Sequence, residues 1–180
     1  QDKKIEAFGI GYPAVANEPC NIELLPLTTD MNAVRTRINS MVSRGATYIP
    51  TGLLWGWNIL DASAPFTEGR TKAALKEMNG RKVLVLMTDG ENTISPSYPT
   101  HDGRDIATSN STLTDICTNV KKDEIEVYTV SFMVPSETVK TLLEKCATSN
   151  DHYFDADNST QLNAAFAEIA KDLASIRLTN

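Results

Sequence analysis

The sequence predicts an α/β domain with a mostly parallel sheet and helices on both faces. Five apolar residues follow one another at 83–87 and stop at a polar turn, as in a strand buried on both sides. Strand-like segments elsewhere alternate with helical patterns of ten or more residues, which is the order typical of parallel sheets. The hydrophobic content of 41% over 180 residues is sufficient for one core.

The first twenty residues show no regular pattern apart from a short strand-like segment at Ile5–Ile10. We therefore expect a poorly defined segment at 1–20 and one α/β domain at 21–180. Residues Asn21–Thr28 look like a strand, in which Pro26 favours a sheet edge or a strand end.

The helices are expected from apolar spacing and capping residues. Thr29 or Asp30 can cap a first helix with its apolar side chains on one face, and Gly45 is suited to its end. A second helix follows Thr51. The later elements, in order, are a short helix at 72–78, a strand at Lys82–Thr88, a polar loop at Glu91–Thr108, a helix at Ser111–Lys121, a strand at Glu126–Phe132, a helix at Ser136–Cys146, a short strand at His152–Phe154 and a helix at Ser159–Ser175.

The charge balance narrows the classes of partner. The net charge is −6, and no run of Lys or Arg exceeds two residues, which argues against nucleic acid or an anionic membrane as the main partner. No segment approaches the roughly 20 apolar residues of a membrane-spanning helix. Because Gln1 is not a natural start, we expect a processed or excised piece, with any membrane anchor outside it.

Three cysteines bear on the redox environment. The absence of a C-x-x-C pattern, with only two histidines in the chain, argues against a cysteine zinc site. Cys117 and Cys146 lie near the ends of two predicted helices that flank one strand, which favours a disulfide and an oxidising compartment. The alternative is two buried free thiols. Cys20 has no assigned partner.

Asp89 and Glu91 follow the most apolar strand directly. Ligand sites in parallel α/β sheets lie beyond the carboxyl ends of the strands, and Gly90 lets the backbone turn there. Asp89 is therefore a candidate ligand for Mg²⁺ or Ca²⁺, with the hydroxyls of Thr47 and Thr51 as the nearest further donors. The alternative is that Thr88 and Asp89 only cap the turn.

Two motifs, GATYIPTGL at 45–53 and VLVLMTDGE at 83–91, resemble those of von Willebrand factor type A domains. The resemblance implies a Rossmann-like fold and a metal-ion-dependent adhesion site, with Thr47 and Asp89 as ligands and Thr51 as the alternative hydroxyl. More narrowly, several segments look like the carboxyl-terminal part of TadG-like proteins of bacterial Tad (Flp) pilus assembly, which implies a location outside the cytoplasm. These segments are LPLTTD at 25–30, GLLWGW at 52–57, APF at 64–66, VYTVSF at 127–132 and CA…YFDA within 146–156.

The family's Asp-x-Ser-x-Ser motif, at the end of its first central strand, is absent from the sequence. Asp61-Ala-Ser63-Ala-Pro65 lacks the final Ser and follows a predicted helix. We therefore expect the missing ligands to lie upstream of Gln1, and Mg²⁺ (or Ca²⁺ or Mn²⁺) to bind this chain weakly or not at all. The strand at Lys82–Thr88 should then lack a neighbour, and residues 1–10, a second copy or another polypeptide should cover its edge.

The sequence thus predicts a non-enzymatic protein-binding or adhesion module of pilus assembly or surface attachment. Its cation would accept a carboxylate from a protein partner, and four residues of the polar loop would set partner choice. Two alternatives remain: a metal-dependent phosphoryl hydrolase using Asp89, for which no nucleophile or base stands out, and a structural domain with a vestigial metal site. The four loop residues are Glu91, Asn92, His101 and Asp102.

Overall fold

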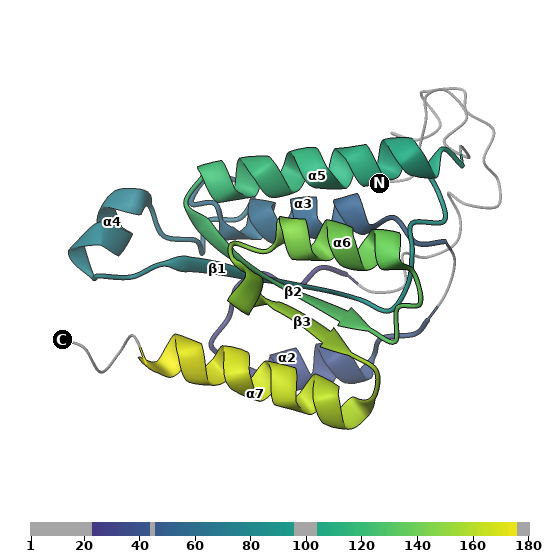
Figure 1. Ribbon diagram of the computed structural model, residues 1–180. Helices are drawn as coiled ribbons and strands as arrows, with labels where there is room; N and C mark the ends of the chain where they lie inside the picture. The colour runs from purple at the N-terminus through teal and green to yellow at the C-terminus, as the bar shows by residue number, and fades with distance from the viewer. Residues whose placement is uncertain (1–22, 44–45, 96–103, 176–180) are drawn as a thin grey trace.

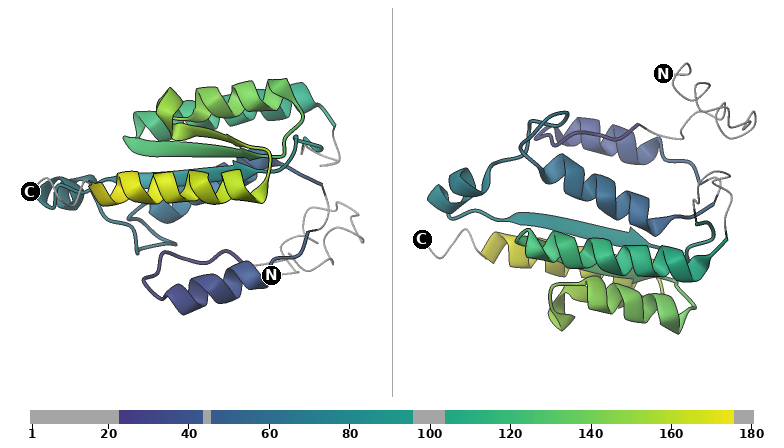
Figure 2. Two further views of the ribbon diagram at one scale, coloured as in Figure 1. Left: turned by 60° about the horizontal axis from the view of Figure 1, so that its bottom comes forward. Right: turned by 90° about the horizontal axis from the view of Figure 1, so that it is seen from above.

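The computed structural model describes residues 23–43, 46–95 and 104–175 (Figure 1). Within these residues the chain forms a parallel sheet with helices on both faces, which confirms the predicted fold class (Figure 2). Three segments named above, Ile5–Ile10, Gly45 and the 101–102 pair, lie outside the described residues.

The described strands are β1 (Lys82–Thr88), β2 (Ile125–Phe132) and β3 (Tyr153–Ala156), in the spatial order β1-β2-β3. The central strand β2 pairs in parallel with both neighbours, and the register places Thr88 opposite Ser131 at the end of β1. Because the strands run in one direction, their carboxyl ends lie at the same edge of the sheet. We call this the carboxyl edge, and the opposite one the amino edge.

Three helices cover one face of the sheet: α3 (Ile49–Leu60), α5 (Ile106–Lys122) and α6 (Glu137–Cys146) (Figure 1). Alternate residues of β1 and β2 point into this layer, as the two-residue period of a strand requires. The main core lies here, and its buried side chains include Leu53, Leu84, Leu113, Val127 and Leu143.

A bond between Cys117 and Cys146 joins α5 to α6 within this core, and both cysteines are buried. The two sulfurs come from helices that flank β2, the placement from which the sequence favoured this pairing. Cys20 lies outside the described residues.

The opposite face carries α7 (Ser159–Ser175), which packs Ile169 against Tyr128 and Val130 of β2 (Figure 2). The helix starts where the sequence predicts, because the Asn158 side chain accepts a hydrogen bond from the backbone N–H of Gln161 at 3.0 Å. A smaller core therefore forms over β2 and β3.

The helix α2 (Met31–Asn39) stands away from the sheet (Figure 2). Asp30 caps it, accepting from the N–H groups of Asn32 and Ala33, but none of its residues is buried. Its apolar side chains Met31 and Ile38 are 55% and 56% exposed. Local capping thus forms this helix without a packed face.

Some boundaries differ from the prediction. Residues 23–28 form no strand, which corrects the expectation for Asn21–Thr28; the described strands bond to one another and not to this segment. The helix α5 begins at Ile106, inside the predicted loop, because the Asp105 side chain accepts from the N–H of Thr108 at 3.0 Å. The remaining elements are the short helix α4 (Lys72–Glu77) and the 3₁₀ turn η1 (Asn150–His152).

Among the described residues, β1 pairs only with β2, so its other side is an open edge. On the face that carries α7, Val85 and Met87 of β1 are 39% and 47% exposed, because α7 lies over β2 and β3. No described residue forms the first central strand that carries the Asp-x-Ser-x-Ser motif in the resembled family. Open strand edges are places where another strand can add.

Candidate functional site

The loop that precedes α3 is bonded to the segment that follows β1. The backbone C=O of Thr47 accepts hydrogen bonds from the N–H groups of Thr93 at 2.9 Å and Ile94 at 3.3 Å. In the other direction, the N–H of Thr47 donates to Oγ1 of Thr93 at 2.7 Å. Thr47 is thus fixed against a residue four positions after Asp89, and both loops lie at the carboxyl edge.

Asn92 holds the same two loops together from inside. Its Oδ1 accepts from the N–H of Ile49 at 2.8 Å, and its Nδ2 donates to Oδ1 of Asn110 at 2.9 Å. The residue is only 2% exposed. Asn92 was expected to contact a partner, and its burial corrects this: the amide joins α3, α5 and the turn after β1 and is not on the surface. The sequence alone offers no signal that distinguishes this asparagine from an exposed one.

The turn after β1 is closed by Thr88. Its hydroxyl donates to the C=O of Gly90 at 3.0 Å and also lies 3.3 Å from the N–H of Gly90, which donates to it. A Cβ added at Gly90 would meet no atom within 4 Å, and the residue has no left-handed φ, so the turn does not require glycine. Thr88 therefore serves the turn, and Asp89 is not needed for it.

The side chains of Thr47, Thr51 and Asp89 form no hydrogen bond with any residue in the described ranges. Thr51 and Asp89 are exposed, and Thr47 is partly exposed. Hydroxyl and carboxylate oxygens are the donors that Mg²⁺ and Ca²⁺ take, so this set fits a hard cation in kind. It falls short in number, because Mg²⁺ takes roughly six ligands.

The look-alike segment at Asp61 is engaged elsewhere. Asp61 is the residue at which α3 ends, its carboxylate accepts from the hydroxyl of Ser63 and from the N–H of Ala62, and these bonds lower the pKa of the carboxyl group. Its carboxylate serves the local turn, in agreement with its exclusion as an Asp-x-Ser-x-Ser motif.

Of the remaining loop residues, Glu91 is exposed beside the turn, whereas His101 and Asp102 lie outside the described residues. The carboxyl edge thus offers a surface with a free carboxylate and free hydroxyls, held by buried hydrogen bonds beneath. Ligand sites of parallel α/β sheets lie at this edge, beyond the carboxyl ends of the strands.

The sequence model of the von Willebrand factor type A domain matches residues 16–168, and the chain belongs to this family. A comparison with curated proteins finds no significant match.

Solved structures with a similar fold include a pilus adhesin and a matrix protein of the mussel byssus. The pilus adhesin SpaC from Lactobacillus rhamnosus GG has a TM-score of 0.60 and 17% identity, over 82% of this chain and 22% of that chain. Proximal thread matrix protein 1 from the mussel byssus has a TM-score of 0.54 and 20% identity, over 81% of this chain; one of its structures is described as having a zinc-occupied MIDAS motif. This chain matches about a fifth to a third of the length of those proteins, and at these identities the likeness shows the fold.

Across the described ranges, the helices are too short or too polar to cross a membrane.

Proposed function

We propose that this chain is a protein-binding domain of the adhesion type, with a divalent-cation site at the carboxyl edge. Thr47 and Asp89 are the ligands, and Thr51 is the alternative hydroxyl. The observation that carries the proposal is the set of hydrogen bonds between Thr47 and residues 93–94, which brings the two motif loops together. A cation at this edge would supply an open coordination position for a carboxylate of the partner protein.

The remaining ligands come from outside this sequence, because no Asp-x-Ser-x-Ser motif occurs in it. The open edge of β1 supports this part of the proposal. A strand that adds to β1 in parallel ends at the carboxyl edge, where its last residues would lie beside Asp89. The side chains of the same added strand would lie beside those of Val85 and Met87, which are exposed among the described residues.

The buried disulfide supports a location outside the cytoplasm, since such bonds persist in oxidising compartments. The resemblance to TadG-like proteins, with a pilus adhesin among the proteins of similar fold, favours a role in Tad/Flp pilus assembly or surface attachment. We expect the exposed Glu91 to set partner choice together with His101 and Asp102, which follow it in the sequence.

Complementation with a strand tests the proposed site. A synthetic peptide with an apolar strand that ends in Asp-x-Ser-x-Ser is added to the chain, and Mg²⁺ binding is measured by calorimetry. We expect weak or no binding by the chain alone and micromolar binding with the peptide, lost in Asp89→Ala and kept in the matched control Asp61→Ala. Two results would contradict the proposal. One is micromolar Mg²⁺ affinity without the peptide that depends on Asp89, and the other is Mg²⁺ affinity that is unchanged in Asp89→Ala.

Function is then tested on the complemented chain with an acidic peptide and its Glu→Gln counterpart. We expect capture of the acidic peptide in Mg²⁺ and none in chelator. Capture that persists in chelator would instead favour a structural domain with a vestigial site. Phosphatase activity above background that requires Mg²⁺ and Asp89 would favour the hydrolase alternative.

A further inference from the structure

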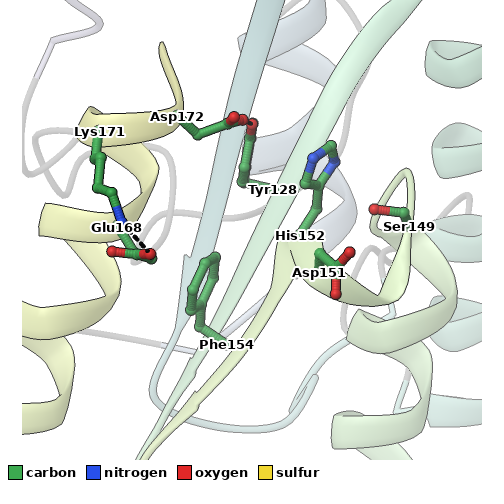
Figure 3. A pocket seen from close by; sticks show the side chains of 8 residues that line it. All are labelled: Tyr128, Ser149, Asp151, His152, Phe154, Glu168, Lys171 and Asp172. Carbon is green, nitrogen blue, oxygen red and sulfur yellow. Dashed lines mark hydrogen bonds and ion pairs between the residues drawn. The ribbon is translucent and has the colours of Figure 1, made fainter. Parts of the chain in front are cut away.

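Five polar side chains meet at the amino edge, on the face that carries α7. Arg81 precedes β1, and Glu126 and Tyr128 are alternate residues of β2, so they share this face. His152 comes from η1 and Asp172 from the last turns of α7. Figure 3 shows Tyr128, His152 and Asp172 converging between the sheet and α7. This amino-edge cluster lies at the opposite end of the strands from Asp89.

Arg81, Tyr128 and His152 contact the two carboxylates of the cluster. The Arg81 guanidinium pairs with Glu126 and lies 3.5 Å from Oδ2 of Asp172. The Tyr128 hydroxyl donates to Asp172 and lies 3.4 Å from Oε1 of Glu126. Nε2 of His152 is 3.3 Å from the same Oε1. In this state Arg81 supplies the positive charge between the two acids.

Three of these residues also have the chemistry and spacing of a metal site. Glu126, His152 and Asp172 each offer one ligand atom, and these atoms all lie within 4.8 Å of one another. Zinc bonds to His and carboxylate atoms are about 2.0–2.2 Å, so in a tetrahedral site ligand atoms lie roughly 3.4 Å apart. Shifts of about 1 Å in these side chains would therefore close the set around one ion.

The imidazole is oriented toward the cluster by packing. The ring of His152 lies against the ring of Tyr128, with centroids 4.1 Å apart and an angle of 32° between the planes. Its Nδ1 is buried without a hydrogen-bond partner among the described residues, so the contact of Nε2 with Glu126 is the polar contact that its ring makes there. A buried nitrogen without a hydrogen-bond partner costs free energy of folding. Such a nitrogen is unusual in a network that serves only the stability of the fold.

A pocket of about 380 Å³ opens onto the cluster and gives an ion a path from solvent (Figure 3). Tyr128, His152 and Asp172 line this pocket, and Asp151 and Glu168 add two further carboxylates to its lining. Lys171 is paired with Glu168 at 3.1 Å and lines the same pocket. The wall carries more acidic than basic groups, which favours entry of a cation.

The position of Arg81 bears directly on metal binding. Its guanidinium pairs with Glu126 and lies 3.5 Å from Oδ2 of Asp172, so it occupies the space between the two carboxylates. A positive charge at this place opposes the binding of a second cation.

We propose that Glu126, His152 and Asp172 form a second metal site, for a transition-metal ion such as Zn²⁺, in which Arg81 competes with the metal. An imidazole ligand favours Zn²⁺ over Mg²⁺, and this separates the site in chemistry, as well as in place, from the oxygen-only set of Thr47 and Asp89. The inference does not depend on the proposed adhesion function.

Zinc binding by competition with a chromogenic chelator tests the site, on the whole chain carrying Cys20→Ser to remove the unassigned thiol. We expect one Zn²⁺ per chain, at least tenfold weaker binding in His152→Ala and in Glu126→Gln, and unchanged binding in His101→Ala, the other histidine of the chain. Arg81→Gln should bind at least tenfold more tightly, because the competing charge is gone. With Co²⁺, the visible spectrum should change in the chain with histidine 152 intact and not in His152→Ala.

Circular dichroism shows whether each variant is folded, and Arg81→Gln keeps all three ligands. If neither the unaltered cluster nor folded Arg81→Gln binds Zn²⁺, the amino-edge cluster is only an ion-pair network and the proposal fails. It also fails if binding is the same in His152→Ala or is lost in His101→Ala.

Discussion

The two faces of the sheet are covered to very different degrees. Under α3, α5 and α6, side chains such as Leu53 and Leu143 are completely buried, and a disulfide joins two of the helices. On the other face, α7 buries Tyr128 and Val130 of β2 but leaves Met87 of β1 47% exposed. The first face is a fully packed core, which we call the finished face. The second face, which we call the open face, is packed only over β2 and β3.

This difference in packing shows that the missing contacts lie along β1. The exposed residues of the second face lie along β1, the same strand whose outer edge is unpaired among the described residues. Helix α2, with no buried residue, also stands away from the sheet (Figure 2). One strand added beside β1 would pair with its open edge and lie next to its exposed side chains. This strand would end at the carboxyl edge, where Asp89 needs further ligands.

The largest effect should come from a core deletion on the finished face. Leu143→Ala removes a side chain that is fully buried in α6, and should lower the free energy of unfolding by about 3–4 kcal/mol. Met87→Ala, its counterpart on the open face, should cost less than about 1 kcal/mol, because much of this side chain is already in water. Urea unfolding measures both. Equal losses would show that the two faces are equally packed.

Removing the disulfide should come next. The bond spans a sequence separation of 29 residues, for which the loss of loop-closure constraint is about 3 kcal/mol in the double variant Cys117→Ala with Cys146→Ala. Reduction of the unaltered chain should lower the unfolding midpoint in the same direction. A midpoint that does not respond to reduction would mean that the cysteines are not bonded in solution.

Acid should affect the two faces by similar, smaller amounts. Lys72 and Trp57 lower the pKa of Asp123 beside the finished face, and Tyr128 and Arg81 lower that of Asp172 on the other. A lowered pKa stabilises the fold above the unfolded value of about 3.9, and this contribution is lost as the pH falls through the folded pKa. Asp123→Asn and Asp172→Asn should each reduce the loss of stability below about pH 4, by less than about 1 kcal/mol because the groups are largely exposed. A steeper acid transition in either variant would contradict this.

The smallest effect on the chain alone should come from charge on the open face. Val85→Lys should change the free energy of unfolding by no more than about 0.5 kcal/mol, since the position is 39% exposed. The same change should weaken binding of the strand peptide described above, because side chains of the added strand would lie beside position 85. Unaltered peptide binding, measured by fluorescence anisotropy, would place the peptide elsewhere.

Sequence reasoning was most accurate where the signal is local. The bounds of β1 follow from an apolar run with polar ends, and the start of α7 follows from Asn158 and Gln161. It was wrong for residues 23–28, whose strand-like pattern finds no partner among the described strands. A strand needs a neighbour, and the pattern of one segment does not supply it.

The sites show the same division. The motif loops at Thr47 and Asp89 could be read because each is a short contiguous pattern that resembles the family. Hydrogen bonds between Thr47 and residues 93–94 join the two loops. The burial of Asn92 and the amino-edge cluster could not be read. The cluster draws on residues from 81 to 172 that meet only through the register of β1 with β2 and the placement of α7.

The most direct test of the carboxyl-edge site is paramagnetic broadening of backbone amide signals by Mn²⁺, since it detects even weak binding. In the chain complemented with the strand peptide, we expect the amides of Thr47, Thr51 and Gly90 to broaden together at low Mn²⁺ concentration, and to remain sharp in Asp89→Asn. Any broadening around His152 should form a separate set that Asp89→Asn leaves in place. If the Thr47 and Gly90 signals stay sharp while others broaden, or broaden equally in Asp89→Asn, then these two loops do not share a cation.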